Sequence, residues 1–467
     1  MDFVFPVITF PYASRILAPD GIGQVNFSNS ITFYFAMLAG LGVGTYATRE
    51  AARIKEDRNA LNKFSKEILV LNLISTCVSY FLFALSLVVV PKFKAYRVLM
   101  ILSSSTIIFR ALSFSWLYNA FEEFKLITLR TSVFQLLSLG FLFVFVRTPD
   151  DLIPYMIFGL IAPVGCNAFN LIYARKYVRL NYKGRLELKK HLKPVFIFFA
   201  MAFVTSIYET LDSSMLGFLS NDAEVGYYSA AIKINRMVLM LITSLAGVLL
   251  PRLSYYSEKN DGEKFYNLVK KSLSMNFLIA LPCAAGIFFL SEPLMLLFCG
   301  EKYLPAVPAM RVMSFIIIII SAHTILGAQV LPAVKKEKTV FISHALGAVI
   351  NIVCNSFLIL RLGCLGAGIA SVLAEFFILV FQAVFFVRHM PCRDVIPYVI
   401  RNMLHAVLAT AVMSLAVAAV LFFTQNIMLK ILLSTLCGAL TYGLVLFILR
   451  NGCLSDVLMT FKRKVKK

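Results

Sequence analysis

The sequence predicts an all-α integral membrane protein with about fourteen transmembrane helices. Of its 467 residues, 60% are hydrophobic and only 15% are charged, whereas a soluble domain carries about 25% charged residues. Most apolar stretches run for 18 residues or more, which is enough for a helix to cross a bilayer. They lack the alternation of barrel strands, and a backbone in lipid must satisfy its own hydrogen bonds. The spans are therefore expected to be helices.

The predicted spans follow one another with short connections, so no separate soluble domain is expected. They are residues 3–17, 23–48, 68–90, 97–118, 126–146, 152–174, 194–217, 225–250, 272–290, 305–331, 340–360, 365–387, 399–423 and 428–449. The first span contains Pro6 and Pro11 and is too short for a hydrocarbon core of about 30 Å. Either the chain begins late or this helix is half-length.

The basic residues predict how the chain is oriented. Alternate connections hold 33 Lys and Arg on one side of the membrane and 8 on the other. Cytoplasmic connections are enriched in Lys and Arg, so both termini and the connection 175–193 are expected in the cytoplasm. Only the connection 91–97 fits this orientation poorly. The net charge of +21 thus indicates a multi-pass protein of the cytoplasmic membrane rather than a nucleic-acid partner.

An internal repeat is indicated by a shift of 203 residues. The shift places Gly23 on Gly226 and Arg49 on Arg252, and each pair brackets a helix that ends in a charged loop. Six predicted spans separate the copies, so both insert the same way up, as in transporters whose site lies between two lobes. The expected organisation is two six-helix lobes with pseudo-two-fold symmetry and two additional C-terminal helices with a basic tail, at residues 1–190, 191–390 and 391–467.

Seven charged residues remain inside the predicted spans. Each costs about 2.5–3.5 kcal/mol at a helix centre in lipid, so these side chains must face the protein interior or water. The cations are Arg110, Lys233, Arg236 and Arg311, and the acids are Glu209, Asp212 and Glu375. The acids are candidates for coupling to an ion.

Four of these charges are expected to form one cluster. Glu209 and Asp212 share a helical face, as do Lys233 and Arg236, and the two pairs match in depth on neighbouring antiparallel helices. One interpretation is a structural ion-pair cluster that holds the helices together. The other is a water-filled cavity with an anion site and a protonatable acid.

The remaining polar residues divide between ligand and structural roles. Arg110 and Arg311 have no acid nearby in sequence, which favours a ligand role. Arg15 and Arg49 lie near span ends, where a long basic side chain can snorkel, that is, keep its charge in water at little energetic cost. His323 is interpreted as a packing residue rather than a proton relay. Small residues three or four apart allow helices to approach closely, and this explains Gly40, Gly42 and Gly44.

No metal, cofactor or nucleotide is expected. The nine cysteines lie singly, without the spacing of a metal site, and are interpreted as small apolar residues. No phosphate-binding loop of the Gly-x-x-x-x-Gly-Lys-[Ser/Thr] kind occurs in the sequence, so ATP is not expected to drive the protein.

Several stretches together resemble the Wzx-type polysaccharide flippases. This family belongs to the superfamily that also contains the multidrug MATE exporters and the lipid II flippases. The resemblance runs in order from about residue 8 to 376 and is strongest at Phe10-Pro-Tyr-Ala-Ser-Arg, Gly42-Val-Gly-Thr-Tyr-Ala-Thr-Arg, Trp116-Leu-Tyr-Asn-Ala-Phe, Thr148-Pro-Asp-Asp, Gly226-Tyr-Tyr-Ser-Ala-Ala, Gly300-Glu-Lys-Tyr-Leu-Pro and Gly363-Cys-Leu-Gly-Ala-Gly.

The resemblance implies a central cationic cavity that opens alternately to each side of the membrane. The implied substrate is an oligosaccharide on an undecaprenyl-pyrophosphate carrier, turned from the cytoplasmic to the outer leaflet, with membrane lipids and polysaccharide polymerase or chain-length proteins as partners. It implies substrate arginines at Arg15 and Arg49, and a cation in the eighth span at Lys233 or Arg236. Physical chemistry agrees, because arginine binds phosphate in a bidentate way and an inside-negative potential favours outward movement of an anion.

Two other functions stay open at this point. A multidrug or cation antiporter of the same fold would need a cavity rich in acids and aromatic residues, because it recognises cations. A membrane glycosyltransferase or polymerase would need a catalytic constellation, and the predicted outer connections contain no histidine. We therefore expect a transporter and not an enzyme.

Overall fold

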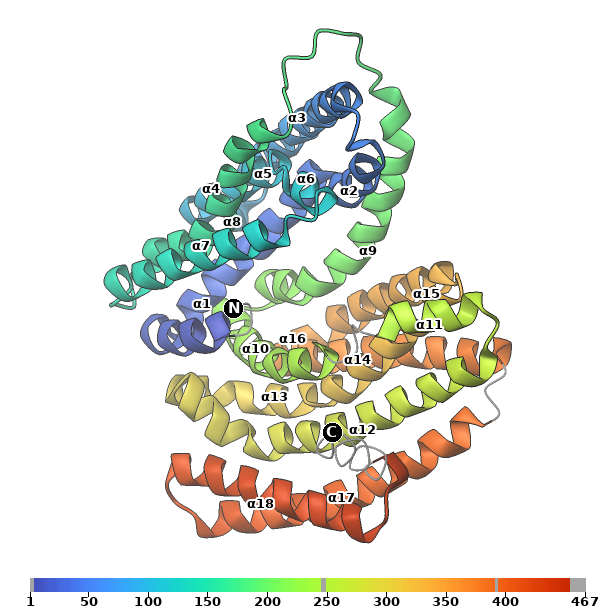
Figure 1. The fold of residues 1–467 in the computed structure, drawn as a ribbon. Helices are drawn as coiled ribbons and strands as arrows, with labels where there is room; N and C mark the ends of the chain where they lie inside the picture. Colours follow the sequence, from blue (N-terminus) through green and yellow to red (C-terminus); the bar gives the residue numbers. More distant parts are fainter. Residues whose placement is uncertain (1–3, 245–248, 391–393, 454–467) are drawn as a thin grey trace. The chain divides into compact units, whose positions relative to one another are not determined.

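The computed structural model is all-helical over the residues that it describes, 4–244, 249–390 and 394–453 (Figure 1). By contacts between residues, the chain divides into two compact units, Met1–Gly226 and Tyr227–Lys467. Within the described residues, nine helices are long and apolar enough to cross a membrane. The expected count of fourteen spans and the predicted lobe boundaries stay predictions.

The elements of unit 1 include several short helices between long ones. They are α1 (Val4–Gly40), α2 (Val43–Ile54), α3 (Arg58–Val89), η1 (Pro91–Lys94), α4 (Arg97–Ser103), α5 (Ser105–Ala111), α6 (Ser115–Ala120), α7 (Phe124–Phe145), α8 (Leu152–Tyr173), η2 (Ala174–Lys176), α9 (Lys189–Leu219) and the first residues of α10 (Asp222–Ser244). Helix α1 packs against α3, α5 and α9, while α7 and α8 form a hairpin.

Unit 2 likewise contains short helices between long ones. They are the rest of α10, α11 (Leu249–Glu258), α12 (Gly262–Phe298), η4 (Glu301–Ala306), α13 (Val307–Met313), α14 (Phe315–Ile325), the π-helical turn η5 (Leu326–Val330), α15 (Leu331–Ala333), α16 (Glu337–His389), α17 (Val395–Phe423) and α18 (Ile427–Ile448). Helix α12 packs against α14, α17 and α18, and α16 packs against α13 and α14.

Two of the long elements each contain a sharp bend, and each covers two predicted spans. Helix α1 bends at Ala18 (φ 59°), directly before Pro19, because a proline disfavours the helical conformation of the residue before it. Helix α16 bends at Gly363 (φ 54°, ψ −129°), where glycine tolerates the left-handed region. Hydropathy reports how favourably a segment enters lipid, and it carries no information about backbone angles. The sequence therefore predicted two spans in each of these elements, but not the bend that connects them.

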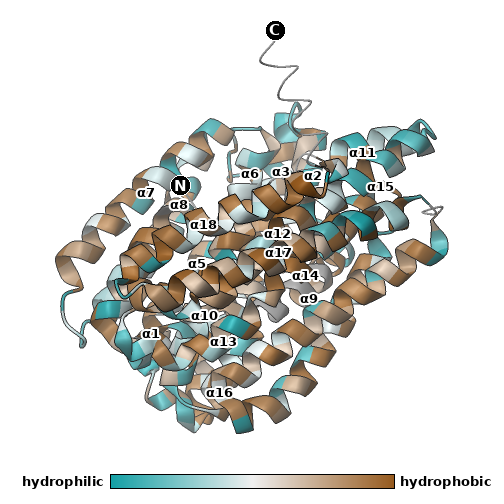
Figure 2. Ribbon diagram, turned by 90° about the horizontal axis from the view of Figure 1, so that it is seen from below, coloured by the Kyte–Doolittle hydropathy of each residue, from teal (hydrophilic) through white to brown (hydrophobic). Residues whose placement is uncertain are grey.

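The outer faces of several helices are apolar, as contact with lipid requires. Helix α18 exposes leucines three or four residues apart, which lie on one stripe of the helix; they are Leu429, Leu432, Leu433, Leu436, Leu440 and Leu444. Figure 2 shows α17 and α18 coloured mostly for hydrophobic residues. In water this surface would be an aggregation liability, so the protein is a multi-pass membrane protein.

Two glycines that the 203-residue shift had paired make the same kind of contact. A Cβ atom on Gly23 would overlap the carbonyl oxygen of Asp222, and one on Gly226 would overlap the carbonyl oxygen of Pro19. The shift of 203 residues that pairs Gly23 with Gly226 also pairs Pro19 with Asp222. All four residues lie in unit 1, and a reciprocal contact of this kind is what a two-fold relation between repeats produces.

Close packing at the glycines of the second predicted span is confirmed in part. Gly42 lies between α1 and α2 with φ +67°, and a Cβ atom there would overlap the backbone of Phe199 on α9. A Cβ on Gly40 would lie 3.8 Å from the Nε atom of Arg110, and one on Gly44 would meet no atom within 4 Å. Of these three positions, only position 42 requires glycine both for its positive φ and for the lack of space for a Cβ atom.

A buried carboxylate ties the start of α9 to α2 and α3. The carboxyl of Glu67 on α3 is fully buried, and its Oε2 atom lies 2.8 Å from Nε2 of His191. The other ring nitrogen of His191 lies 2.7 Å from the hydroxyl of Tyr46 on α2. The backbone N–H of Glu187 donates to Oε1 of Glu67 (2.8 Å), and Lys190 lies 3.3 Å from Oε2. Lys190, in the first turn of α9, also lowers the pKa of the carboxyl of Glu187, which lies just before that helix.

Removing this carboxylate is expected to destabilise unit 1 strongly. Glu67→Ala would leave the buried ring of His191 and the N–H of Glu187 without their acceptor, and breaking a buried pair costs about 3–5 kcal/mol. The matched control is Glu50→Ala on α2, which removes a surface pair with Arg53 (3.4 Å), worth about 0–1 kcal/mol. Thermal unfolding of the purified protein in detergent measures both. Equal losses in the two variants would show that the buried pair is not stabilising.

Candidate functional site

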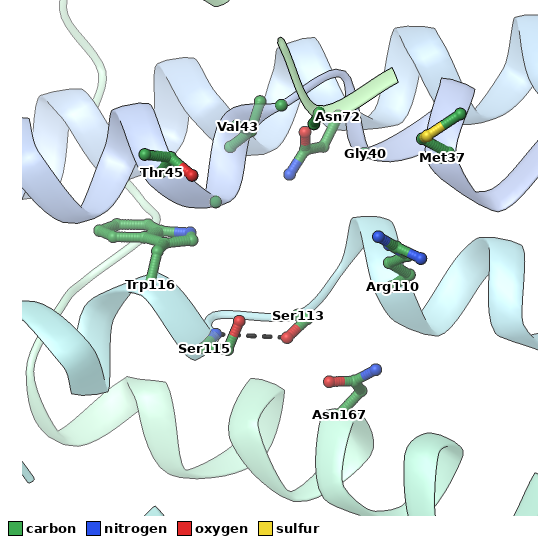
Figure 3. A pocket seen from close by; sticks show the side chains of 13 residues that line it. Met37, Gly40, Val43, Thr45, Asn72, Arg110, Ser113, Ser115, Trp116 and Asn167 are labelled. Atoms are coloured by element: carbon green, nitrogen blue, oxygen red, sulfur yellow. Dashed lines mark hydrogen bonds between the residues drawn. The ribbon is translucent and has the colours of Figure 1, made fainter. Parts of the chain in front are cut away.

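Two adjoining cavities in unit 1 share Arg110 and Asn167 in their walls. The first has a volume of about 300 Å³ and lies between the α1–α2 junction, α3, the break between α5 and α6, and α8 (Figure 3). The second, of about 430 Å³, lies between α1, α5 and α8. No Asp or Glu occurs among the residues that line either cavity. Arg110 is therefore the ionised group of this site.

A break in the helix places Arg110 at the cavity. Helix α5 ends at Ala111, whose carbonyl accepts a hydrogen bond from the Nδ2 atom of Asn72 (2.7 Å). The N–H of Ser115 then donates to the hydroxyl of Ser113 (3.2 Å) and so begins α6 (Figure 3). Arg110 thus lies in the last turn of α5, where the helix dipole favours a cation.

The guanidinium of Arg110 is open to a ligand. It lies over the ring of Phe33 at 5.2 Å, and its side chain is exposed in this structure. Among the residues that the structure describes, no carboxylate lies within 4.0 Å of it. An unpaired guanidinium in a cavity is suited to an anion, and its planar fork matches phosphate oxygens.

Amides and hydroxyls surround the guanidinium. Asn72 is 4% exposed, and its Oδ1 atom has no hydrogen-bond partner. Figure 3 shows Asn167 on the opposite wall, below Ser113, and Asn29 lines the second cavity. Pro163 on α8 also lines that cavity and leaves the carbonyl of Gly159 without a helical partner. Such groups hydrogen-bond to hydroxyl-rich molecules, so the cavity suits a ligand that combines negative charge with sugar hydroxyls.

The other two predicted arginines of unit 1 line neither of these cavities. Arg49 is exposed on α2, with its guanidinium 5.8 Å from the ring centre of Phe198 on α9. Arg15 is exposed on the part of α1 that precedes the bend at Ala18. Their binding roles stay predictions.

The three predicted cations of unit 2 differ in their surroundings. Lys233 is partly buried and Arg236 is exposed, both on α10. Arg311 on α13 has its Nη2 atom 3.9 Å from Oε2 of Glu292, which lies on α12. Glu292 is distant in sequence, so the absence of a neighbouring acid along the chain did not exclude an ion pair in space.

The three predicted acids lie on α9 and α16. Asp212 is buried on α9, while the side chain of Glu209 lies outside the described residues. Glu375 is 5% exposed on α16, and its Oε2 atom lies 2.8 Å from Nε2 of His323 on α14. The expected cluster of Glu209 and Asp212 with Lys233 and Arg236 stays a prediction.

The sequence matches a known family over more than half of its length. The model of the family described as "Polysaccharide biosynthesis protein" matches residues 1–257. The chain belongs to this family. A second family model, MatE, matches residues 197–357. The resemblance to Wzx-type proteins is thereby confirmed, and both matches are to transporters of one superfamily rather than to enzymes.

Similar proteins cover most of this polysaccharide biosynthesis protein. A candidate O-antigen transporter of Shigella dysenteriae is 24% identical over 82% of the chain and 95% of the relative, and one of Escherichia coli K12 is 23% identical over 71% and 80%. Among solved structures, the lipid II flippase MurJ in an inward closed conformation covers 97% of both chains with a TM-score of 0.78 at 18% identity. An inward-facing multidrug resistance MATE transporter covers 86% of this chain and 95% of that chain, with a TM-score of 0.67 at 13% identity. The fold is therefore that of MurJ and the MATE transporters.

The cavity contains functional candidates that counting charges missed. Asn29, Asn72 and Asn167 were not singled out, although an amide without a partner is also costly in an apolar environment. A search for every strongly polar side chain within the spans would have found them. The cation–π contact with Phe33 joins two helices and leaves no signal in the sequence.

Proposed function

We propose that this protein moves undecaprenyl-pyrophosphate-linked oligosaccharide repeat units from the cytoplasmic to the outer leaflet of the cytoplasmic membrane, for surface polysaccharide synthesis. The observation that carries the proposal is the exposed, acid-free guanidinium of Arg110 among asparagines and hydroxyls. The guanidinium would bind the pyrophosphate and the amides would bind the first sugars. The family and the O-antigen relatives support the same substrate class.

The path across the membrane is part of the proposal. We infer fourteen spans with both termini cytoplasmic, and two six-helix lobes that open alternately. The reciprocal contact of Gly23 and Gly226 supports the two-fold relation. Arg15, Arg49, Lys233, Arg236 and Arg311 would hold the headgroup at other stages, while the lipid tail stays in the bilayer.

A MATE-like multidrug antiporter is the second candidate, because a MatE family model matches residues 197–357 and a MATE structure shares the fold. A cationic drug would need acids or an aromatic cage. Aromatic residues, Trp116 in one and Phe33 and Phe109 in the other, line the two described cavities, but the charged group there is an arginine and no acid lines either. The positive charge favours an anionic substrate.

Deleting the gene from its host tests the proposal. We expect loss of surface polysaccharide and accumulation of lipid-linked repeat units on the cytoplasmic side, both reversed by the wild-type gene. Surface polysaccharide is measured with antibody or lectin on intact cells, and lipid-linked sugar in membrane extracts. Unchanged polysaccharide with increased sensitivity to cationic drugs would instead support the antiporter.

A further inference from the structure

Arg130 on α7 is a partly buried cation of unit 1 that lines neither of the two cavities described above. Its Nε and Nη1 atoms are buried and have no hydrogen-bond partner among the described residues. The guanidinium lies over the ring of Tyr118 on α6, at 5.5 Å from the ring centre. Within the described chain, no carboxylate forms an ion pair with it. Burying an unpaired charge is costly, so this position favours an anionic ligand.

The packing of α7 on α8 places Arg130 beside Asn170. The two helices form an antiparallel hairpin (Figure 1), and a Cβ atom on Gly165 of α8 would lie 2.4 Å from the ring of Phe134. Arg130 lies one turn before Phe134 on the same face of α7, so its neighbour on α8 lies one turn beyond Gly165. Tyr118 supports this placement, because its hydroxyl donates to the backbone carbonyl of Asn170 (2.7 Å).

The side chain of Asn170 is the second polar group at this position. It is fully buried, and neither its Nδ2 nor its Oδ1 atom has a hydrogen-bond partner among the described residues. Cys166, one turn earlier on the same face of α8, lies within electrostatic range of Arg130. The amide of Asn170 therefore lies on the helix face that is turned toward the guanidinium. One phosphate oxygen could accept hydrogen bonds from both groups.

The position of the two groups along their helices fits the headgroup of a lipid. Arg130 lies about one turn inside the predicted span 126–146, and Asn170 about one turn inside the predicted span 152–174. Both lie near the ends that the proposed orientation places toward the cytoplasm. A helical turn rises about 5.4 Å, so the two groups would lie close to the phosphates of the cytoplasmic leaflet. Basic pockets between membrane helices on this side bind anionic lipid headgroups.

The surface of α7 beside Arg130 fits the acyl chains of such a lipid. Leu129, Val133 and Leu137 follow one another at intervals of four residues and are 62%, 46% and 58% exposed. Residues at this spacing form one apolar stripe along a helix. The stripe begins next to Arg130 and runs away from the cytoplasmic end of α7, which is the direction an acyl chain would take into the bilayer.

A second cation lies on the cytoplasmic side of the guanidinium. The Nζ atom of Lys176 lies over the rings of Tyr173 and Tyr177, at 5.2 and 5.6 Å from their centres. The ring of Tyr173 in turn lies 6.1 Å from that of Tyr118. One acid on this side, Glu123, accepts a hydrogen bond from the hydroxyl of Tyr177 (2.6 Å). Lys176 thus adds positive charge where the outer part of a headgroup would lie.

We propose that Arg130 and Asn170 bind the phosphate of an anionic phospholipid in the cytoplasmic leaflet, between α7 and α8. A phosphodiester carries one negative charge, which one guanidinium balances, whereas the pyrophosphate of the proposed substrate carries at least two. The site is distinct from the cavities that contain Arg110. A bound lipid would stabilise the packing of α6, α7 and α8, and its binding does not depend on the proposed transport function.

Native mass spectrometry with added phosphatidylglycerol tests the site, because it resolves single bound lipids. We expect the first phosphatidylglycerol to bind Arg130→Gln and Asn170→Leu about 10-fold or more weakly than wild type, since a hydrogen bond to a charged group is lost. Arg147→Gln, an exposed arginine just after the other end of α7, is the control and should bind like wild type. Phosphatidylcholine with the same acyl chains should bind all four proteins equally weakly. Equal affinity of wild type and Arg130→Gln for phosphatidylglycerol would overturn the site.

Photocrosslinking of wild-type protein tests the same site without any substitution. Phosphatidylglycerol with a photoreactive acyl chain should label α7 and α8, and labelling confined to other helices would contradict the proposal. An equal concentration of undecaprenyl pyrophosphate distinguishes the two sources of phosphate and should leave the labelling of α7 and α8 unchanged. Loss of that labelling would assign the site to the substrate carrier and overturn a phospholipid site. Neither measurement requires flipping, so failure of the proposed function would leave both results interpretable.

Discussion

Replacing Arg110 by alanine is expected to abolish the appearance of surface polysaccharide while the protein remains in the membrane. Arg110 is the cation shared by the two cavities of unit 1, and its guanidinium has no acidic partner among the described residues. Hydrogen bonds to charged groups contribute about 1.5–3 kcal/mol each, so loss of a bidentate contact should weaken substrate binding by about 100-fold or more.

The lysine variant and a matched arginine separate charge from geometry. Arg110→Lys keeps the charge but loses the planar fork, so activity should fall part-way. Arg147→Ala removes an exposed arginine from the connection between α7 and α8 and should leave activity unchanged. Polysaccharide on cells and protein level in membranes are measured together. Full activity of Arg110→Ala at normal protein level would remove the anion cavity from the mechanism.

Alanine at Gly23 or at Gly226 is expected to destabilise unit 1. In each case the new Cβ atom would overlap a backbone carbonyl oxygen, and a backbone atom cannot turn aside as a flexible side chain can. Overpacking of this kind costs about 1–3 kcal/mol or more. Because the two contacts are reciprocal, the two variants should lose similar amounts of stability.

The control for this experiment is Gly140→Ala. Gly140 lies within α7, and a Cβ atom there would meet nothing within 4 Å. Alanine favours a helix by up to about 1 kcal/mol over glycine, so this variant should be neutral or more stable. Thermal unfolding in detergent measures all three proteins. Stability equal to the control at both contact glycines would contradict the reciprocal packing.

The sequence was sufficient for the membrane class and the family, because both depend on properties distributed along the chain. The length of apolar stretches predicted helices in lipid, and the shift of 203 residues identified the two glycines that make reciprocal contacts. It also identified Arg110 from the cost of a charge inside a span. These inferences need no knowledge of which side chains meet.

Features that depend on contacts in space were not predictable in this way. The break after Arg110 is stabilised by Asn72, which is 39 positions away from Ala111 along the chain. Arg311 approaches Glu292 from another helix. His323, interpreted from the sequence as a packing residue, faces Glu375 on a separate helix at 2.8 Å. Each of these contacts joins two different helices. Hydropathy does not determine which helices pack against each other, so it could not predict the contacts.

Flipping of lipid-linked oligosaccharide by purified protein in liposomes tests the central claim most directly. The substrate, isolated from the gene-deleted host and labelled on its sugars, is placed in the inner leaflet, and an impermeant glycosidase outside reports its arrival. We predict that wild-type and Arg147→Ala proteins expose the sugars to the enzyme, whereas Arg110→Ala and protein-free liposomes do not. Exposure at the protein-free rate with wild-type protein, or at the wild-type rate with Arg110→Ala, would contradict the account.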